Sequence, residues 1–382
     1  MRDIKPISRE NYDVIVVGGG IAGISAVVTA ARQGVSALLI EKKVNLGGLA
    51  TGGLISWYEP LCDGEGKQML FGMAEELLKL SIRYSFDNLS AHWGGSGAEN
   101  GRYATFFSPT VFSLALDRFV VESGAKLRLD TYATYPVMEG KHCTGLICES
   151  ISGREFFGAK VVIDATGDAS VCHRAGVPTV EGENYMTYMI HYTDRKSCSQ
   201  FGAGGKAHKN RKWLNYGSDM AGNGHPDGMP KLRGVDADEQ TAYLLHGKAA
   251  MLEMLSQKDR DSFDIMTLPT MAQYRTIRRI VGAADFKAID GKECADSIGE
   301  CGDFRPENMG KHYALPYGAL YNPEFDNLLA CGRIISAPAG DGWEVARVIP
   351  TCAFTGEAAG IAAAYAAKNG KSVNAINYKE IK

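Results

Sequence analysis

The feature that most constrains the fold of this sequence is a glycine fingerprint that follows an apolar run near the N-terminus. Residues 13–17 read as a buried parallel strand, and residues 18–23 continue it as Gly-Gly-Gly-Ile-Ala-Gly before an Ala-rich stretch of helical composition. In this spacing Gly18 permits a tight turn and Gly20 lets a pyrophosphate approach the backbone. Gly23 lets the helix pack closely against the strand. The sequence therefore predicts a β–α–β unit that binds a dinucleotide.

Two further properties of this unit concern its ligand. The N-terminus of the predicted helix offers unpaired N–H groups and the positive end of a dipole to phosphate groups. Glu41 ends the next apolar run, about where a carboxylate that accepts a ribose hydroxyl is expected. NAD and FAD sites share this geometry, so the fingerprint alone leaves the dinucleotide unidentified.

Three later segments have the pattern with which flavoproteins complete their cofactor site. Residues 327–336 read as a strand that ends at Gly332-Arg333, and Thr355-Gly356 is predicted to open a helix of small residues. Arg347 and Pro350 lie between these two motifs. Residues 161–168 form an apolar strand that finishes in an Ala-Thr-Gly turn.

With these motifs the chain resembles the glutathione-reductase-like flavoprotein superfamily, and more narrowly the FAD-dependent oxidoreductase family of largely uncharacterised bacterial proteins. Residues 275–282 and Leu315-Pro316-Tyr317 fit that family as well, whereas residues 180–270 are not distinctive. The resemblance implies non-covalently bound FAD and an α/β fold with a Rossmann-type FAD-binding domain. It also implies a flavin ring on the N-terminus of the C-terminal helix, and it leaves the substrate open.

The residues expected at the cofactor lie in the glycine turns, beside the predicted ribose carboxylate, on one strand near residue 137 and in the C-terminal segments. They are Gly18, Gly20, Ile21, Ala22, Gly23, Glu41, Lys42, Gly47, Gly48, Leu49, Val137, Ala165, Thr166, Gly167, Gly332, Arg333, Arg347, Thr355 and Gly356. Arg347 is expected at the ribityl-phosphate side or at the pyrimidine edge of the ring. Positive charge at that edge stabilises reduced, anionic flavin.

The length of the chain favours two domains. At 382 residues it is too long for one ordinary compact core. Residues 1–179 and 306–382 are predicted to form a discontinuous FAD-binding domain. Residues 180–305 are predicted to form an inserted, mixed α+β substrate or cap domain built on an antiparallel sheet.

Flavin chemistry on an organic substrate needs side chains that hold the substrate and move protons. The candidates are His92, Arg102, Tyr103, His191 and Arg275. Purely structural roles also remain open. His92 could be an exposed loop histidine, Arg102 could form a surface salt bridge, and His191 could be a core histidine on an alternating strand. Arginine holds carboxylates bidentately, so the sequence predicts a small anionic organic substrate that exchanges hydride with the flavin.

Arg275, Arg278 and Arg279 form the most unusual charged cluster in the sequence. Guanidinium groups are costly to bury without partners. In an extended strand Arg275 and Arg279 would share one face and Arg278 the other. Two roles remain open for the cluster. Two of the three arginines could form salt bridges, and one arginine could bind an anionic substrate.

Composition excludes several other classes. With 45% hydrophobic and 22% charged residues the chain has the composition of an ordinary globular protein. A net charge of −3 gives no excess of positive charge with which to bind nucleic acid. The charged N-terminus lacks a signal-peptide core, and no apolar run is long enough for a membrane span. Nine scattered cysteines, without the spacing of a zinc or iron–sulfur site, predict a reducing, cytoplasmic location and no metal.

Two alternative functions stay open at this stage. The chain could be an electron-transfer flavoprotein subunit of a redox complex, or a nucleotide-binding module without redox activity. The absence of cysteine cluster motifs counts against the first, and the flavin-like C-terminal motifs count against the second. The sequence does not identify a redox partner or show whether NAD(P)H is used.

Overall fold

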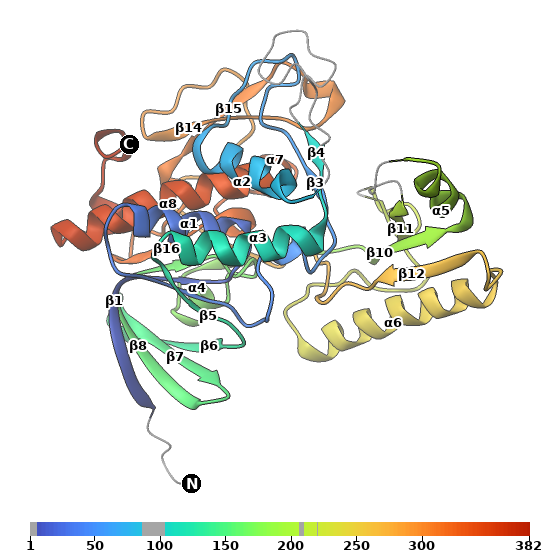
Figure 1. Ribbon diagram of the computed structural model, residues 1–382. Coiled ribbons are helices and arrows are strands. Elements are labelled where there is room, and N and C mark those ends of the chain that lie inside the picture. The colour runs from blue at the N-terminus through green and yellow to red at the C-terminus, as the bar shows by residue number, and fades with distance from the viewer. Residues whose placement is uncertain (1–5, 86–103, 206–209, 220) are drawn as a thin grey trace.

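The computed structural model describes residues 6–85, 104–205, 210–219 and 221–382, arranged as a larger body and a smaller projecting part (Figure 1). The body is built on a seven-stranded sheet with the strand order β5-β2-β1-β8-β7-β6, and β16 pairs with β8. The strands are β1 (Ile7–Val17), β2 (Ala37–Ile40), β5 (Lys126–Arg128), β6 (Tyr132–Glu139), β7 (His142–Ser150), β8 (Gly153–Asp164) and β16 (Leu328–Ala330). The α/β class predicted from the sequence is confirmed.

The sheet is parallel on one side and antiparallel on the other. β1 runs parallel to β2 and β8, and β2 runs parallel to β5, while β7 is antiparallel to both β6 and β8. β8 is long enough to pair with β7 in its first half and with β16 at its end. As a result Val17, Ile40, Asp164 and Ala330 end side by side at one edge. Ligands of open α/β sheets bind outside this carboxyl edge.

The helices α1 (Ile21–Arg32) and α8 (Ile349–Asn369) pack against each other through glycines. A Cβ at Gly356 would lie 2.1 Å from the carbonyl oxygen of Ala22, and one at Gly360 would lie 2.5 Å from that of Ala26. Two further helices, α2 (Gly72–Arg83) and α3 (Pro109–Glu122), complete this layer (Figure 1).

The prediction that Thr355-Gly356 opens the C-terminal helix was wrong, because α8 already begins at Ile349. Pro350 occupies the first turn, where its fixed φ fits and its missing N–H removes no hydrogen bond. Thr355 and Gly356 therefore lie inside the helix, and the N–H groups at its start belong to the residues that follow Arg347.

The smaller part has its own sheet and core. β10 (Thr187–Asp194) lies between β11 (Lys212–Gly217) and β12 (Phe263–Thr267), all antiparallel, as the sequence predicted. The helix α6 (Ala237–Ser256) packs on this sheet. The side chains of Tyr188, Met251 and Tyr274 belong to a hydrophobic cluster separate from the two clusters of the body.

Short elements connect the two parts and cover the body. β9 (Thr179–Glu181) pairs with β13 (Arg278–Ile280) where the chain leaves the body and returns to it. Phe286, Ile298 and Cys301 belong to the large core of the body. The remaining elements are β3 (Trp57–Tyr58), β4 (Thr105–Phe106), α4 (Ser170–Arg174), α5 (Arg195–Gly202), β14 (Ser297–Gly302), β15 (His312–Pro316) and α7 (Trp343–Ala346).

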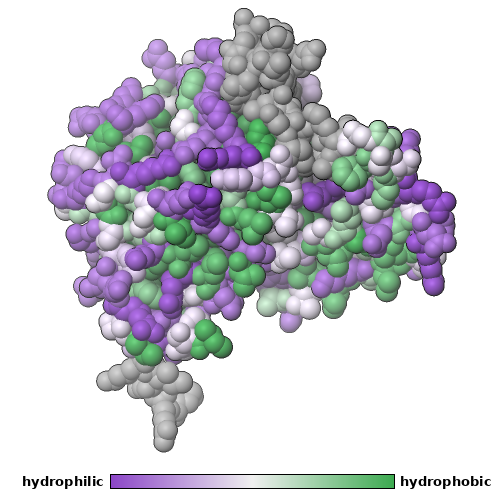
Figure 2. Space-filling view, in the orientation of Figure 1, coloured by the Kyte–Doolittle hydropathy of each residue, from purple (hydrophilic) through white to green (hydrophobic). Residues whose placement is uncertain are grey.

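The surface of the molecule is mixed. Figure 2 shows hydrophobic and hydrophilic residues in small interspersed patches over the body and over the projecting part. Among the described residues, none of the helices is both long and apolar enough to cross a membrane.

Candidate functional site

A cavity of about 620 Å³ runs along the carboxyl edge of the parallel strands and continues under the smaller part. Most of the residues that the sequence assigned to a cofactor line it. They are Gly18, Gly20, Ile21, Ala22, Glu41, Lys42, Gly47, Gly48, Leu49, Ala165, Thr166, Gly167, Gly332, Arg333 and Arg347. Segments from both ends and from the middle of the chain thus meet at one site.

The glycines of this cavity leave room for a pyrophosphate. A Cβ at Gly20 would meet no atom of the described residues within 4 Å, so this position faces open space in that part of the structure. The glycine turn at Gly47 is held beside the turn at Gly20, because the N–H of Gly47 donates to the carbonyl of Gly19 at 2.7 Å. Among the described residues, no side chain caps the N-terminus of α1, which begins after Gly20. Its N–H groups and its dipole therefore suit a phosphate.

Glu41 is buried at one end of the cavity, where its orientation is fixed by the backbone. One carboxylate oxygen accepts the N–H of Gly19 at 2.5 Å, and the other accepts the N–H of Lys43 at 2.8 Å. A carboxylate has about four acceptor sites, so two remain for ribose hydroxyls. The side chain of Lys42 lies 3.6 Å from Asp168 on the same wall.

Another part of the cavity is electropositive. Arg347, Ile349 and Cys352 line it at the N-terminus of α8. Burial, together with the nearby positive charge of Arg275, lowers the pKa of Arg347 to about 10. The guanidinium carbon of Arg347 lies 5.1 Å from the ring centre of Trp343. Both the helix dipole and this guanidinium favour negative charge here.

Four predicted cofactor residues lie outside the lining of this cavity. A Cβ at Gly23 would lie 1.9 Å from the Gly18 carbonyl, so this glycine packs helix on strand, as the sequence predicted. Thr355 holds the turn beside the cavity, because its hydroxyl accepts the N–H of Gly332 at 2.9 Å. Gly356 packs on α1, and Val137 lies on the outer strand β6, whose Tyr132 lines the cavity instead.

Sequence reasoning missed the contribution of the smaller part. Gln240 and Leu244 of α6 line the cavity, as do Thr270, Met271, Ala272, Tyr274 and Ile277. No local motif marks these positions, because they reach the site only through the packing of the two parts. Ile349 and Cys352 were missed because the start of this helix was predicted at Thr355. The signal for the true start of α8 was Pro350, since proline is favoured in the first turn of a helix.

Three of the catalytic candidates, His92, Arg102 and Tyr103, lie outside the described residues. His191 is buried on β10 and is not part of the cavity lining. Its Nε2 has no hydrogen-bond partner among the described residues, and its ring lies 6.5 Å from that of Trp213. Burial, assisted by the nearby Arg211, lowers the pKa of His191 to about 4. The imidazole is therefore neutral near pH 7.

This burial predicts a pH-dependent stability. As the pH falls below about 6.5, the unfolded imidazole of His191 takes up a proton, whereas the folded one stays neutral until about pH 4. Stability should therefore fall between these values, by up to about 3 kcal/mol from this residue. A His191→Phe variant should lose less stability than the wild type between pH 7 and pH 5 in urea unfolding. An unchanged loss would contradict the assignment.

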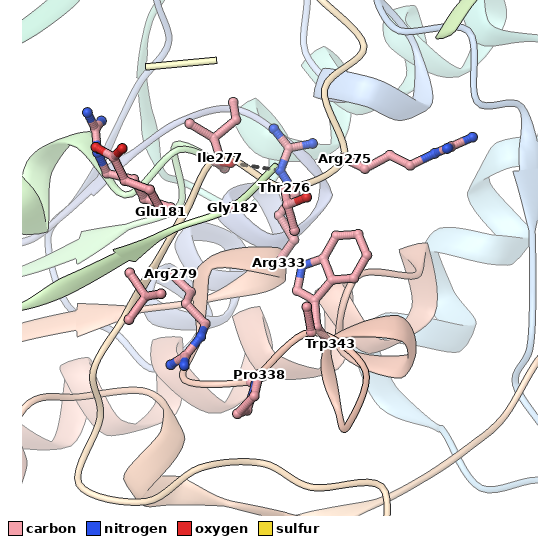
Figure 3. Close-up of a pocket in the computed structure, with 14 residues that line it drawn as sticks. Glu181, Gly182, Arg275, Thr276, Ile277, Arg279, Arg333, Pro338 and Trp343 are labelled. Atoms are coloured by element: carbon pink, nitrogen blue, oxygen red, sulfur yellow. Dashed lines mark hydrogen bonds and ion pairs between the residues drawn. The ribbon is translucent and has the colours of Figure 1, made fainter. Parts of the chain in front are cut away.

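The three arginines of the cluster have different partners in the structure. Arg278 lies 3.6 Å from Glu181, and Arg279 lies 3.7 Å from Asp285. The guanidinium of Arg275 has no hydrogen bond or ion pair within the part of the chain that the structure describes, and burial lowers its pKa. Arg275 lies before β13, which begins only at Arg278, so the strand geometry that would place Arg275 and Arg279 on one face does not apply. Figure 3 shows the two side chains pointing in different directions.

A second cavity, of about 260 Å³, lies beside the first. Gly167, Ile277 and Arg333 line both cavities. Arg333 is held between them by a hydrogen bond from its Nε to the carbonyl of Gly167, at 2.7 Å. Among the described residues, His, Cys, Asp and Glu side chains form no group of three that could hold a metal ion.

Comparison with known proteins identifies a matching family and relatives of about half of the chain. The profile of the family described as FAD dependent oxidoreductase matches residues 13–271 and 262–382. A digeranylgeranylglycerophospholipid reductase from Methanoculleus marisnigri is 28% identical over 206 residues, which are 50% of this chain and 46% of that protein. The enzyme of the same name from Methanosarcina mazei is 27% identical over 235 residues, or 58% and 52% of the two chains. The matches thus span about half the length of these curated relatives.

Solved structures share the fold. A geranylgeranyl bacteriochlorophyll reductase-like protein from Thermoplasma acidophilum superposes with a TM-score of 0.52 at 14% identity, over 98% of this chain and 82% of that one. CabE, an aromatic hydroxylase from angucycline biosynthesis, superposes with a TM-score of 0.50 at 13% identity, over 97% and 66%. At such identities these likenesses show the fold alone.

Proposed function

Because this chain belongs to the FAD-dependent oxidoreductase family, whose cofactor is FAD, we propose that it transfers hydride between the flavin and a small anionic organic molecule. One observation carries the proposal: a single cavity joins a glycine cradle at Gly20 to a buried guanidinium at Arg347. The first end suits the pyrophosphate, and the second suits the flavin ring and an anion.

The residues of the cavity fit FAD in a defined order. Glu41 would hold the adenosine ribose. Gly20 and Gly48 would leave room for the pyrophosphate, and Arg347 would lie near the flavin ring. FAD supplies two-electron redox chemistry when it is bound. The N-terminus of α8 and the charge of Arg347 would stabilise negative charge at the ring and on the substrate.

An anionic substrate would also explain Arg275. A half-buried guanidinium that makes no ion pair among the described residues is costly, and a second positive charge nearby, on Arg347, raises that cost. A carboxylate that approaches both groups would relieve the cost and be oriented by them. Arg278 and Arg279 have acidic neighbours at 3.6 and 3.7 Å, whereas Arg275 has no ion pair among the described residues.

The division into domains follows from the same arrangement. We propose that residues 1–179 and the C-terminal part of the chain bind FAD, and that the part built on β10 and α6 covers the substrate. Phe286 and Ile298 pack in the core of the body, so the second boundary is placed near β13 rather than at residue 305.

Replacement of Arg275 by Met tests the proposed recognition of an anion. The substrate is first found by anaerobic screening of the holoenzyme against carboxylates, with bleaching or reoxidation of the flavin as the signal. We expect Arg275→Met to keep its FAD and to raise KM by about tenfold or more, since a hydrogen bond to a charged group is lost. The control is Arg118→Met, because Arg118 is exposed on α3, pairs with Glu122 and lies outside the lining of both cavities. Equal KM values in the two variants, or a substrate without charge, would contradict the proposal.

A further inference from the structure

The second cavity has a composition of its own. Its walls come from β9, β13 and the segment that connects β16 to α8. Six of the fourteen lining residues have apolar side chains: Val180, Ile277, Ala337, Pro338, Ala339 and Trp343. In Figure 3 the indole of Trp343 and the ring of Pro338 lie on one side, with Glu181 and Ile277 on the other. The cavity is therefore a slot with one aromatic wall.

Cationic groups outnumber anionic ones around this slot. Arg275, Arg278, Arg279 and Arg333 line it together with a single carboxylate, that of Glu181. The two ion pairs of these arginines, at 3.6 and 3.7 Å, are longer than hydrogen bonds. The Nε of Arg278 is buried without a hydrogen bond among the described residues. Such an excess of partly desolvated positive charge favours an anion.

The volume limits the size of the ligand. At about 30 Å³ for each water-sized group, 260 Å³ holds about nine non-hydrogen atoms. A benzoate ion has this number of atoms and a flat apolar ring that an indole can stack on. A sugar acid would bury hydroxyl groups against apolar walls, where they would lack partners.

On the premise of the proposed function, we infer that this cavity holds the body of the substrate, which is a carboxylate with a flat apolar body, such as an aryl carboxylate. The cavity shares Gly167, Ile277 and Arg333 with the FAD cavity, so a ligand in it lies next to the cofactor. Trp343 links the two as well, because its ring lines the slot and also lies against Arg347.

The test is a titration of the yellow holoenzyme with three probes, followed by calorimetry and by the visible flavin spectrum. The probes are benzoate, its neutral analogue benzamide, and lactate as a small polar carboxylate. We expect benzoate to bind and to perturb the flavin spectrum. Benzamide and lactate should bind at least about tenfold more weakly, since the first lacks the charge and the second lacks the apolar body.

Two variants locate the binding. Val180→Phe adds a ring at a 43% exposed position of the slot, and it should weaken benzoate binding by tenfold or more without loss of FAD. The matched control is Val121→Phe, at a 61% exposed position on α3 outside the lining of both cavities. Arg279→Gln should weaken the binding of benzoate and leave that of benzamide unchanged.

The outcomes separate this inference from the proposed function. A preparation that binds no FAD would refute the proposed function before any titration. A yellow holoenzyme that does not bind benzoate, or that binds it equally in Val180→Phe, would overturn the inference alone. Equal affinity for lactate and benzoate would also overturn it, while the anionic nature of the substrate would stand.

Discussion

A Gly20→Val variant is expected to fold normally and to lose its FAD. Gly20 has extended backbone angles, φ −73° and ψ 177°, which valine adopts readily. A Cβ there meets no protein atom within 4 Å, so the apoprotein should accept the side chain. The same space is where the pyrophosphate is expected, and the isopropyl group would fill it. FAD affinity should fall by about a hundredfold or more, because direct contact with the N-terminus of α1 is lost.

The measurement is the flavin content of the purified variant after reconstitution with excess FAD, together with its circular dichroism and unfolding curve. Gly202→Val is the matched control, because a Cβ at Gly202 also meets no atom within 4 Å and the residue lies on α5, outside the FAD cavity. This control should be yellow. A yellow Gly20→Val protein with wild-type affinity would show that the pyrophosphate does not pass this residue.

Gly356→Val is expected to destabilise the fold itself, whereas Gly20→Val should affect the binding of FAD alone. A Cβ at Gly356 would lie 2.1 Å from the carbonyl oxygen of Ala22 and 2.9 Å from the Cβ of Ser25. Both neighbours belong to α1, so neither can move without moving the helix against the sheet. Overpacking of this kind costs about 3 kcal/mol or more, a large part of the roughly 5–15 kcal/mol that stabilises a typical domain.

Urea unfolding of the apoprotein measures this effect without a contribution from the cofactor. Ile361→Val, on the same helix, is the control, because it keeps a β-branched side chain and removes only one methylene group. It should lose no more than about 1.5 kcal/mol. A Gly356→Val protein as stable as this control would mean that α1 and α8 do not meet as described.

The parts of the site that were predicted from the sequence are those that local spacing encodes. The turn at Gly18, the opening at Gly20 and the carboxylate of Glu41 all belong to one β–α–β unit, whose geometry sets the distances between them. Thr355 was predicted to open the C-terminal helix, and that part of the prediction was wrong. Its hydroxyl positions Gly332, and the helix start that faces the cavity lies at Ile349.

The remaining features depend on packing between distant segments. Tyr274 and Gln240 reach the FAD cavity because the smaller part folds over it, and nothing in their local sequence indicates this. His191 lies in the alternating pattern of β10, where parity did not distinguish a core position from a ligand-facing one. In the structure it is buried and is not part of the lining of the FAD cavity. Arg275 lies just before β13, so a strand pattern could not tell which way its side chain points.

A crystal structure of the holoenzyme tests the central claim most directly. We predict density for one FAD in the 620 Å³ cavity, with the adenosine ribose on Glu41, the pyrophosphate beside Gly20 and the flavin ring at the start of α8, near Arg347. FAD bound in the reverse direction, or at another place in the molecule, would contradict the account.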